Sequence, residues 1–302
     1  MTHLEAILIK HNYILNNDDK KNINEITNLF ETNKVNEELL DNVNYVYWVG
    51  NYHKYITQDY NEMIKYYLMA IDKGSEVSMF NMGEYHKLIS KNYDKMIQYY
   101  LMAIEKGNSD AMYKMGHYHQ FITKDYDEMK KYYSMAIKRG NSNAMINMGI
   151  YHLGLLDYSE MEKYYLMAIE KGNSDAMYKM GFYYECIEKY NEMKKYYLMA
   201  VDKGVLSAIY RMGHYYQYIR EDYNEMEKYY LVAIEKGHSS AMKSMGDYHQ
   251  TVTKYYDEMK KNYLMAIERG HSGAMKSMGY YYQYGSKDND KMKKYYLMAS
   301  PN

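Results

Sequence analysis

The sequence predicts an all-α solenoid, and three observations lead to this prediction. A unit of about 33 residues recurs from residue 45 almost to the end of the printed sequence, most cleanly as AMYKMGHYHQFITKDYDEMKKYYSMAIKRG. Apolar residues within each unit follow helical spacing. Proline occurs only at Pro301, as expected of a chain that is helical nearly throughout. A fixed period of this length is typical of stacked helix pairs that bury their apolar faces against their neighbours.

Two ladders of glycine mark the units, stepping by 33 residues except for two consecutive steps of 32 in each. The short steps predict a one-residue deletion between the two helices of the fourth and fifth units, around residues 153–158 and 185–190. The closing glycines are Gly74, Gly107, Gly140, Gly172, Gly204, Gly237 and Gly270. The second ladder, preceded by Met or Val, is Gly50, Gly83, Gly116, Gly149, Gly181, Gly213, Gly246 and Gly279.

Each unit predicts a first helix, here called the A helix, and a second, the B helix. Gly140 can take the left-handed conformation that ends a B helix, and Asn141 can cap the A helix that follows. The other face of the B helix is charged and expected in solvent. In the third unit the apolar stripe of the A helix is Ala111, Met112, Met115, Gly116, Tyr118 and His119, and that of the B helix is Met129, Tyr132, Tyr133, Ala136 and Ile137.

Residues 1–44 do not fit the repeat, although helices are expected over residues 2–15 and 23–31, followed by a short segment with Leu39 and Leu40. We interpret this region as a degenerate unit that caps the first hydrophobic edge of the array. The alternative is an independent helix that docks on another protein. The eight predicted repeats span residues 45–74, 78–107, 111–140, 144–172, 176–204, 208–237, 241–270 and 274–300.

Composition argues against several classes of protein. The formal net charge is −1 with evenly spread Lys and Arg, so no nucleic-acid partner is expected. No apolar run approaches the roughly 18 residues that a membrane span needs, so no membrane insertion is expected. The single cysteine, Cys186, cannot form a disulfide framework and predicts a reducing, cytoplasmic compartment.

The unit resembles the Sel1-like repeat, a relative of the tetratricopeptide repeat. That family has Ala, then Leu-Gly, then an aromatic residue in the A helix, with an aromatic pair, small residues and a final Gly in the B helix. The resemblance covers residues 45–300 and implies a right-handed α/α superhelical solenoid with A helices lining a concave groove. The matching residues in the third unit are Ala111, Met115, Gly116, Tyr118, Tyr132, Tyr133, Ala136 and Gly140.

There are departures from the family pattern. The Gly-x-Gly common between the family's two helices is absent, and Met129 and Met135 stand where Ala is usual. The 44 tyrosines and the abundant Asn and Lys are similar to the Sel1-like proteins of large DNA viruses of amoebae, which would place the chain in a host cytoplasm or virion. An A/T-rich genome explains this composition, and selection for an adhesive aromatic surface is the alternative.

Histidine recurs once per unit at one helix position, at His53, His86, His119, His152 and His249. Neighbouring helices lie about 10 Å apart, whereas zinc needs ligands at about 2 Å, so we expect packing roles and no metal site. No nucleophile elbow, phosphate-binding loop or zinc-protease motif occurs. Cys186 shares a position with Phe121, Gly154 and Tyr218 and is interpreted as an ordinary residue at a helix end. We therefore expect no enzyme activity and no cofactor.

The A helix carries three positions that vary between units, and specificity could reside there without disturbing the stack. The centre of this column is apolar and coincides with the shortened units. We therefore predict a protein or peptide partner across the middle of the array, with local burial of these side chains as the alternative. The predicted partner-binding residues are Tyr113, His117, Ile146, Ile150, Leu153, Tyr178, Phe182, Tyr210 and His214.

The sequence thus predicts a non-catalytic scaffold for protein–protein interaction. The family resemblance leaves two alternatives, a subunit of a ubiquitin-ligase or degradation complex and, less favoured, a hydrolase or β-lactam-binding protein. The β-lactam-associated branch carries a disulfide in each repeat, which Cys186 alone cannot reproduce.

Overall fold

The computed structural model describes residues 23–300, and the helix expected over residues 2–15 lies outside this range. Every regular element within it is helical, which confirms the predicted all-α fold class. The helix expected over residues 23–31 is α3 (Ile23–Thr32), and the segment with Leu39 forms a 3-10 turn at Glu37–Leu39. No helix in residues 23–300 combines the length and apolarity of a membrane span.

From residue 43 onward A and B helices alternate. The A helices are α4 (Val43–Tyr52), α6 (Glu76–Leu88), α8 (Ser109–Tyr118), α10 (Ser142–Gly154), α12 (Ser174–Cys186), α14 (Leu206–Tyr218), α16 (Ser239–Tyr248) and α18 (Ser272–Tyr280). The B helices are α5 (Tyr60–Asp72), α7 (Tyr93–Glu105), α9 (Tyr126–Lys138), α11 (Tyr158–Glu170), α13 (Tyr190–Asp202), α15 (Tyr223–Glu235), α17 (Tyr256–Glu268) and α19 (Asn289–Ala299).

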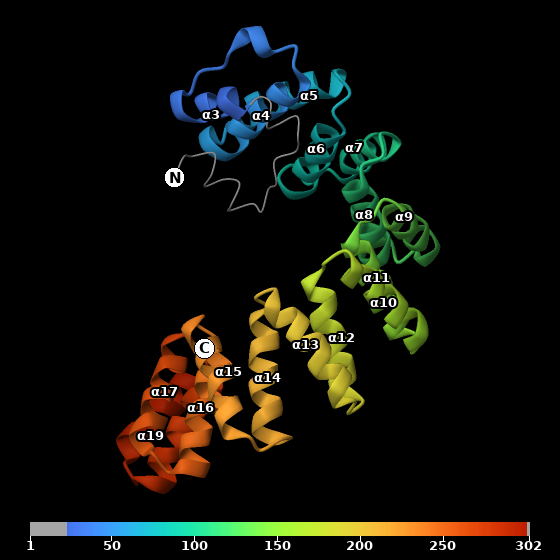
Figure 1. Ribbon diagram of the computed structural model, residues 1–302. Coiled ribbons are helices and arrows are strands. Elements are labelled where there is room, and N and C mark those ends of the chain that lie inside the picture. The colour runs from blue at the N-terminus through green and yellow to red at the C-terminus, as the bar shows by residue number, and fades with distance from the viewer. Residues whose placement is uncertain (1–22, 301–302) are drawn as a thin grey trace. The chain divides into compact units, whose positions relative to one another are not determined.

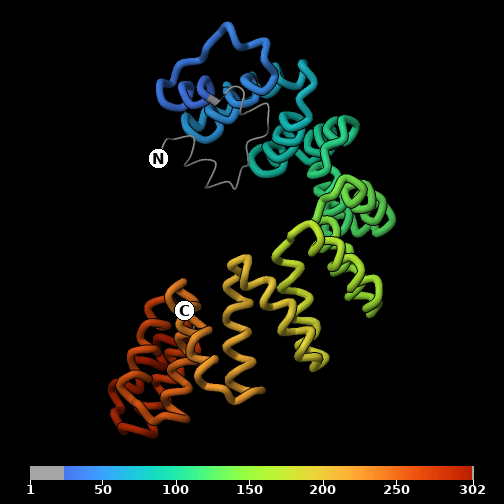
Figure 2. The backbone as a smooth tube through the Cα atoms, viewed as in Figure 1, coloured from blue at the N-terminus to red at the C-terminus, as the bar shows by residue number. Residues whose placement is uncertain are grey.

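The chain forms two compact units, Met1–Tyr151 and His152–Asn302. Within each unit a helix packs on the helix before it and the helix after it in sequence, as Figure 1 shows. The backbone reverses direction between consecutive helices (Figure 2). Each unit is therefore a stack in which contacts are local in sequence, as in other repeat proteins.

The first unit begins with α3 packed on α4. Ile26, Leu29 and Phe30 are fully buried, and the Phe30 ring meets the rings of Trp48 and Tyr52 edge-on at 6.1 and 5.6 Å. The Tyr52 hydroxyl also donates to Asn33 Oδ1 at 2.9 Å. For residues 23–44 this arrangement supports the interpretation of a cap over the first hydrophobic edge.

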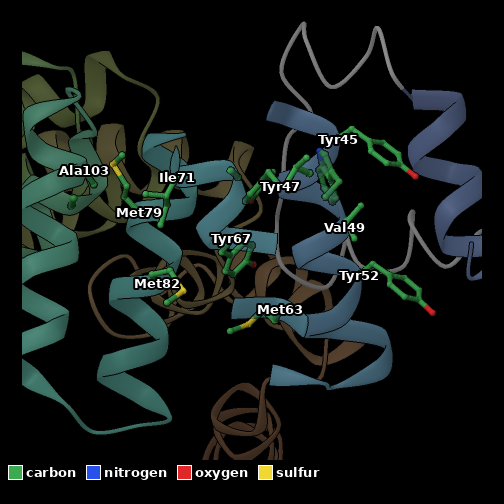
Figure 3. Packing of buried hydrophobic residues seen from close by; sticks show 14 of the residues in the cluster. Tyr45, Tyr47, Val49, Tyr52, Met63, Tyr67, Ile71, Met79, Met82 and Ala103 are labelled. Atoms are coloured by element: carbon green, nitrogen blue, oxygen red, sulfur yellow. The ribbon is translucent and has the colours of Figure 1, made fainter. Parts of the chain in front are cut away.

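Methionine and tyrosine form most of the repeated core. Figure 3 shows Met63 and Tyr67 of α5 between side chains of α4 and the methionines Met79 and Met82 of α6. All four are at most 4% exposed. Because a methionine side chain adapts to irregular gaps, it can fill the space beside the rigid tyrosine ring.

Each B helix ends in the same way, as α9 illustrates. Gly140 has φ of +80°, and its N–H donates to the Ile137 carbonyl while the N–H of Asn141 donates to the Ala136 carbonyl. This pair of bonds is a Schellman motif. Asn141 Oδ1 then accepts from the Ala144 N–H at 3.1 Å and caps the next A helix, which confirms both predictions made from the sequence.

The difference between units of 33 and 32 residues lies where the A helix ends. In the third unit the last turn is π-helical over His119–Thr123, as a one-residue insertion in an α-helix often is. The shortened units keep α-helix to Gly154 and Cys186. The closing hydrogen bond survives the deletion: the cap residue six positions on donates to His53 (Asp59 N–H, 3.1 Å), whereas the donor to His152 is only five positions on (Asp157 N–H, 3.0 Å).

Candidate functional site

The geometry of the A helices rests on one buried tyrosine in each B helix. In the third unit this is Tyr133, and Tyr113 of α8 stacks on it with ring centroids 6.0 Å apart. Tyr178 covers Tyr197 at 5.8 Å, and Tyr210 covers Tyr230 at 5.8 Å. Three of the predicted partner-binding residues, Tyr113, Tyr178 and Tyr210, are thus half-buried and take part in the intramolecular stack.

The hydroxyl of the same tyrosine bonds to the A helix of its own repeat. Tyr133 donates to Gln120 Oε1 at 2.7 Å and accepts from Asn147 of the next A helix at 2.9 Å. Burial raises the pKa of these phenols, so they stay protonated donors. Much of the column that varies in sequence therefore holds a tyrosine hydroxyl. These residues are Asn51, Glu84, Gln120, Glu185, Gln217, Asp247, Gln250 and Gln283.

The recurring histidines pack as predicted. His119 stacks on Tyr132, the first tyrosine of its B helix, at 5.5 Å with an interplanar angle of 3°. Its Nδ1 lies 3.0 Å from the Thr123 hydroxyl one turn later. His53 and His86 repeat the stack at 5.5 and 5.4 Å. The column therefore supports the join between A and B helices.

The apolar residues predicted at the middle of the array differ in exposure. Ile146 is buried at 5% exposed, so the alternative of local burial applies to it. Ile150 and Leu153 are each 38% exposed and Phe182 is 42% exposed. Ile146 and Ile150 belong to the first compact unit, whereas Leu153 and Phe182 belong to the second.

Several A helices expose aromatic pairs four residues apart, a spacing that places both rings on one face. The rings of His214 and Tyr218 lie 4.5 Å apart on α14. Those of His117 and Phe121 lie 4.5 Å apart on α8. Tyr218 is 52% exposed and Phe121 is 55% exposed. None of the printed framework bonds above needs these rings, which leaves them available to a ligand.

In the second unit these rings form a patch across two A helices. The Arg211 guanidinium of α14 lies 5.1 Å from the centre of the Phe182 ring of α12 and 3.2 Å from Glu185 Oε1. Arg211 therefore joins Phe182 to the helix that carries His214 and Tyr218. We call Phe182, His214 and Tyr218 the α12–α14 aromatic patch.

The pKa of His214 makes this patch apolar at neutral pH. Burial lowers it below the usual value; nearby Glu185 opposes this shift, and Arg211 adds to it. The imidazole is therefore an uncharged aromatic ring. The same holds for His117 in the first unit, whose pKa is lowered by burial and by Lys87 and Lys114.

A cavity of about 400 Å³ opens beside the patch, between α14 and α16. The Tyr218 ring is part of both features. Glu221 and Asp247 bring carboxylates to the cavity wall, although one Asp247 oxygen already binds Lys243 Nζ at 2.5 Å. The remaining lining residues are Gln217, Tyr223, Thr251 and Val252.

Sequence reasoning selected Phe182 and His214 but missed Tyr218, Arg211 and the cavity wall. Tyr218 shares its position with Cys186 and was treated as an ordinary helix end. The aromatic residues at a spacing of four, His117 with Phe121 and His214 with Tyr218, were the signal that could have identified this second position.

No protein-family model and no curated protein matches this chain. Two solved structures resemble it. A protective antigen present in uropathogenic Escherichia coli strains, which displays an SLR fold, is 18% identical with a TM-score of 0.65, covering 85% of this chain and 61% of that one. A Sel1 repeat protein from Oxalobacter formigenes is 23% identical with a TM-score of 0.59, covering 71% of this chain and all of that one.

This chain thus spans about three fifths of the length of the first of these proteins. At such low identities the similarity bears on the fold alone, and it agrees with the helix pairs, the glycine turns and the packing of each stack. The chain has the all-α Sel1-like repeat fold.

Proposed function

We propose that this protein is a non-catalytic scaffold that binds a peptide segment of another protein on the A helices of its second unit. The observation that carries the proposal is the α12–α14 aromatic patch. It is exposed, it lies beside a cavity, and the fold does not use it for packing. Exposed aromatic side chains next to a concave surface favour protein contact.

The lining favours a particular ligand chemistry. An apolar side chain of the peptide would cover Phe182 and Tyr218, where burial of a residue of that size contributes about 1.5–3 kcal/mol. A neighbouring basic side chain would meet Glu221 in the cavity, close to the exposed face of Tyr218. We therefore expect peptides that combine an apolar anchor with Lys or Arg.

A displayed peptide library selected on the full chain tests this proposal. Selected peptides should share the apolar and basic residues, and the double variant Phe182→Ser, Tyr218→Ser should weaken their binding by about tenfold or more. The matched control is Leu166→Ser, Leu231→Ser, which removes two apolar side chains that are 40% and 50% exposed on B helices.

Two results would overturn the proposal. The control variant could lose the peptides while the patch variant keeps them, which would place binding on the B helices. Alternatively, circular dichroism could show that the patch variant is unfolded, which would make Phe182 and Tyr218 part of the core. Glu221→Gln provides a separate check, because it should weaken only those peptides that carry the basic residue.

Two further points belong to this proposal. The single cysteine supports a reducing compartment, for which we propose the cytoplasm, or a virion for a viral chain. The tyrosine-, Asn- and Lys-rich composition supports a source among the large DNA viruses of amoebae. Sequencing the genomic neighbourhood of the coding region tests the second point directly.

A further inference from the structure

The B helices of the second unit present the same three residues to the A helix that follows. Met193, Tyr197 and Ala200 of α13 pack against Ala208 and Met212 of α14. The corresponding residues of α15 and α17 meet Ala241 with Met245 and Ala274 with Met278. Each interface therefore joins a Met–Tyr–Ala face to a helix with Ala at one position and Met four residues later.

The last B helix carries the same face with nothing described on its outer side. Met292, Tyr296 and Ala299 are partly exposed, whereas their counterparts Met259, Tyr263 and Ala266 are fully buried. Leu297 is 74% exposed, against 41% for Leu264 at the same position of α17. An open cavity of about 540 Å³ follows this face, lined by Lys276, Ser277, Tyr280, Tyr296, Ala299 and Ser300.

The internal interfaces also specify a polar contact. Three residues after its Ala, the following A helix places a hydrogen-bonding side chain near the core tyrosine of the previous repeat. Ser244 and Ser277 bond the Tyr230 and Tyr263 phenols in this way. The Tyr296 hydroxyl donates to Gln283 Oε1 at 2.8 Å and keeps a lone pair for such a donor.

Charge and the opposite edge argue against a second copy of this chain as the occupant. The other end of the array is covered, because α3 buries Ile26, Leu29 and Phe30 on α4. Within residues 23–300 no ion-pair partner of Lys293 is found, and Lys276 lies on the same side. Two such faces would therefore bring like charges together.

Asn289 argues against an ordinary further repeat. At this position α13, α15 and α17 begin with Tyr190, Tyr223 and Tyr256, each packed on a tyrosine of the following A helix at 5.9, 5.1 and 5.7 Å. Asparagine cannot make this aromatic contact. The covering helix therefore needs no tyrosine there, unlike the A helices of this array.

We propose that the outer face of α19 is a docking site for a helix of another polypeptide. That helix carries Ala or Gly at one position, a hydrogen-bond donor three residues later and Met or Leu four residues later. Acidic residues on its flank meet Lys276 and Lys293. Its contacts continue the interface that the A helices make inside the stack.

The test adds a lactam-stapled peptide with the sequence of residues 238–254, which carries Ala241, Ser244 and Met245, to the full chain. Fluorescence anisotropy should show saturable binding. Leu297→Asp should weaken it by about tenfold, and the matched variant Leu264→Asp should not. Binding that Leu297→Asp leaves unchanged would overturn the proposal, as would the absence of binding once the second measurement has been made.

The second measurement joins residues 234–254 to Ala299, which copies the natural junction after Ala233. Hydrogen exchange of α19 should slow by about tenfold relative to the unextended chain. The slowing should vanish when the appended copy carries Ala241→Glu. If α19 exchanges equally in all three chains, the face does not accept such a helix. If only the tethered helix docks, intermolecular docking is excluded.

Discussion

Gly116 of α8 lies so close to Tyr133 of α9 that a Cβ atom at position 116 would stand 2.4 Å from Cδ1 of the tyrosine ring. The same relationship joins Gly50 to Tyr67, and Gly213 to Tyr230, at 2.5 Å. The second glycine ladder of the sequence is therefore the set of places where a buried tyrosine touches the backbone of the A helix.

This contact predicts that Gly116→Ala destabilises the protein. The added methyl group must displace a fully buried ring, and overpacking of this kind costs about 1–3 kcal/mol. Urea denaturation monitored by circular dichroism measures the loss. Gly154→Ala is the control, because no atom lies within 4 Å of a Cβ built there. It should be neutral or stabilise the helix by up to about 1 kcal/mol. Equal losses would show that the ring can move aside.

The π-helical turn predicts that the third unit tolerates a deletion. Removal of Ile122, which is 65% exposed, should give the α-helical ending seen in the fourth and fifth units and change the unfolding midpoint little. Removal of Ser134 from the middle of α9 should destabilise the fold strongly, because each later side chain would rotate by about 100° around the helix. Comparable losses for the two deletions would contradict this account of the insertion.

The turn between A and B helices predicts a stabilising substitution. Leu156 has φ of +60° and is 70% exposed, and a residue with a Cβ atom in this conformation costs about 1–2 kcal/mol. Leu156→Gly should therefore raise the free energy of unfolding by up to that amount, less the entropy that glycine adds to the unfolded chain. Leu155→Gly should not stabilise, because φ at position 155 is not positive. A gain at position 155 instead of 156 would refute the assignment.

His238 predicts a pH-dependent helix cap. Its Nδ1 accepts from the Ala241 N–H at 3.2 Å, which requires the neutral ring. Burial lowers the pKa of His238, and nearby His271 adds to the shift. The unfolded chain therefore binds this proton first, and the stabilisation is lost as pH falls from about 6.5 through the folded-state pKa. His238→Asn keeps a cap at every pH.

Thermal unfolding from about pH 7.5 to about pH 5 measures this effect. The wild-type midpoint should fall further than that of His238→Asn. The loss of the stack between His238 and Tyr210, whose ring centroids lie 4.7 Å apart, should lower the variant by a similar amount at both pH values. Parallel pH profiles would show that protonation of His238 does not affect the cap.

The fold could be predicted from sequence because its rules are local. Glycine at the end of each B helix, Asn or Asp after it and a helical apolar stripe identify the pairs without knowledge of distant contacts. Gly140 with Asn141 illustrates this, since both act within four residues of their own positions.

The site could be predicted only in part, because variation between repeats has two causes. Gln120 and Glu185 differ in sequence, yet each accepts the hydrogen bond of a buried tyrosine. Ile146 differs from its counterparts and is buried. A column that varies therefore mixes alternative ways to satisfy the core with surface positions, and only packing separates Phe182 and Tyr218 from the rest.

The most direct test of the proposed function is hydrogen exchange of the full chain with and without a selected peptide. The account predicts slower exchange in α12 and α14, around Phe182 and Tyr218, with no change in the B helices α11, α13 and α15. Protection confined to those B helices, with α12 and α14 unaffected, would contradict it.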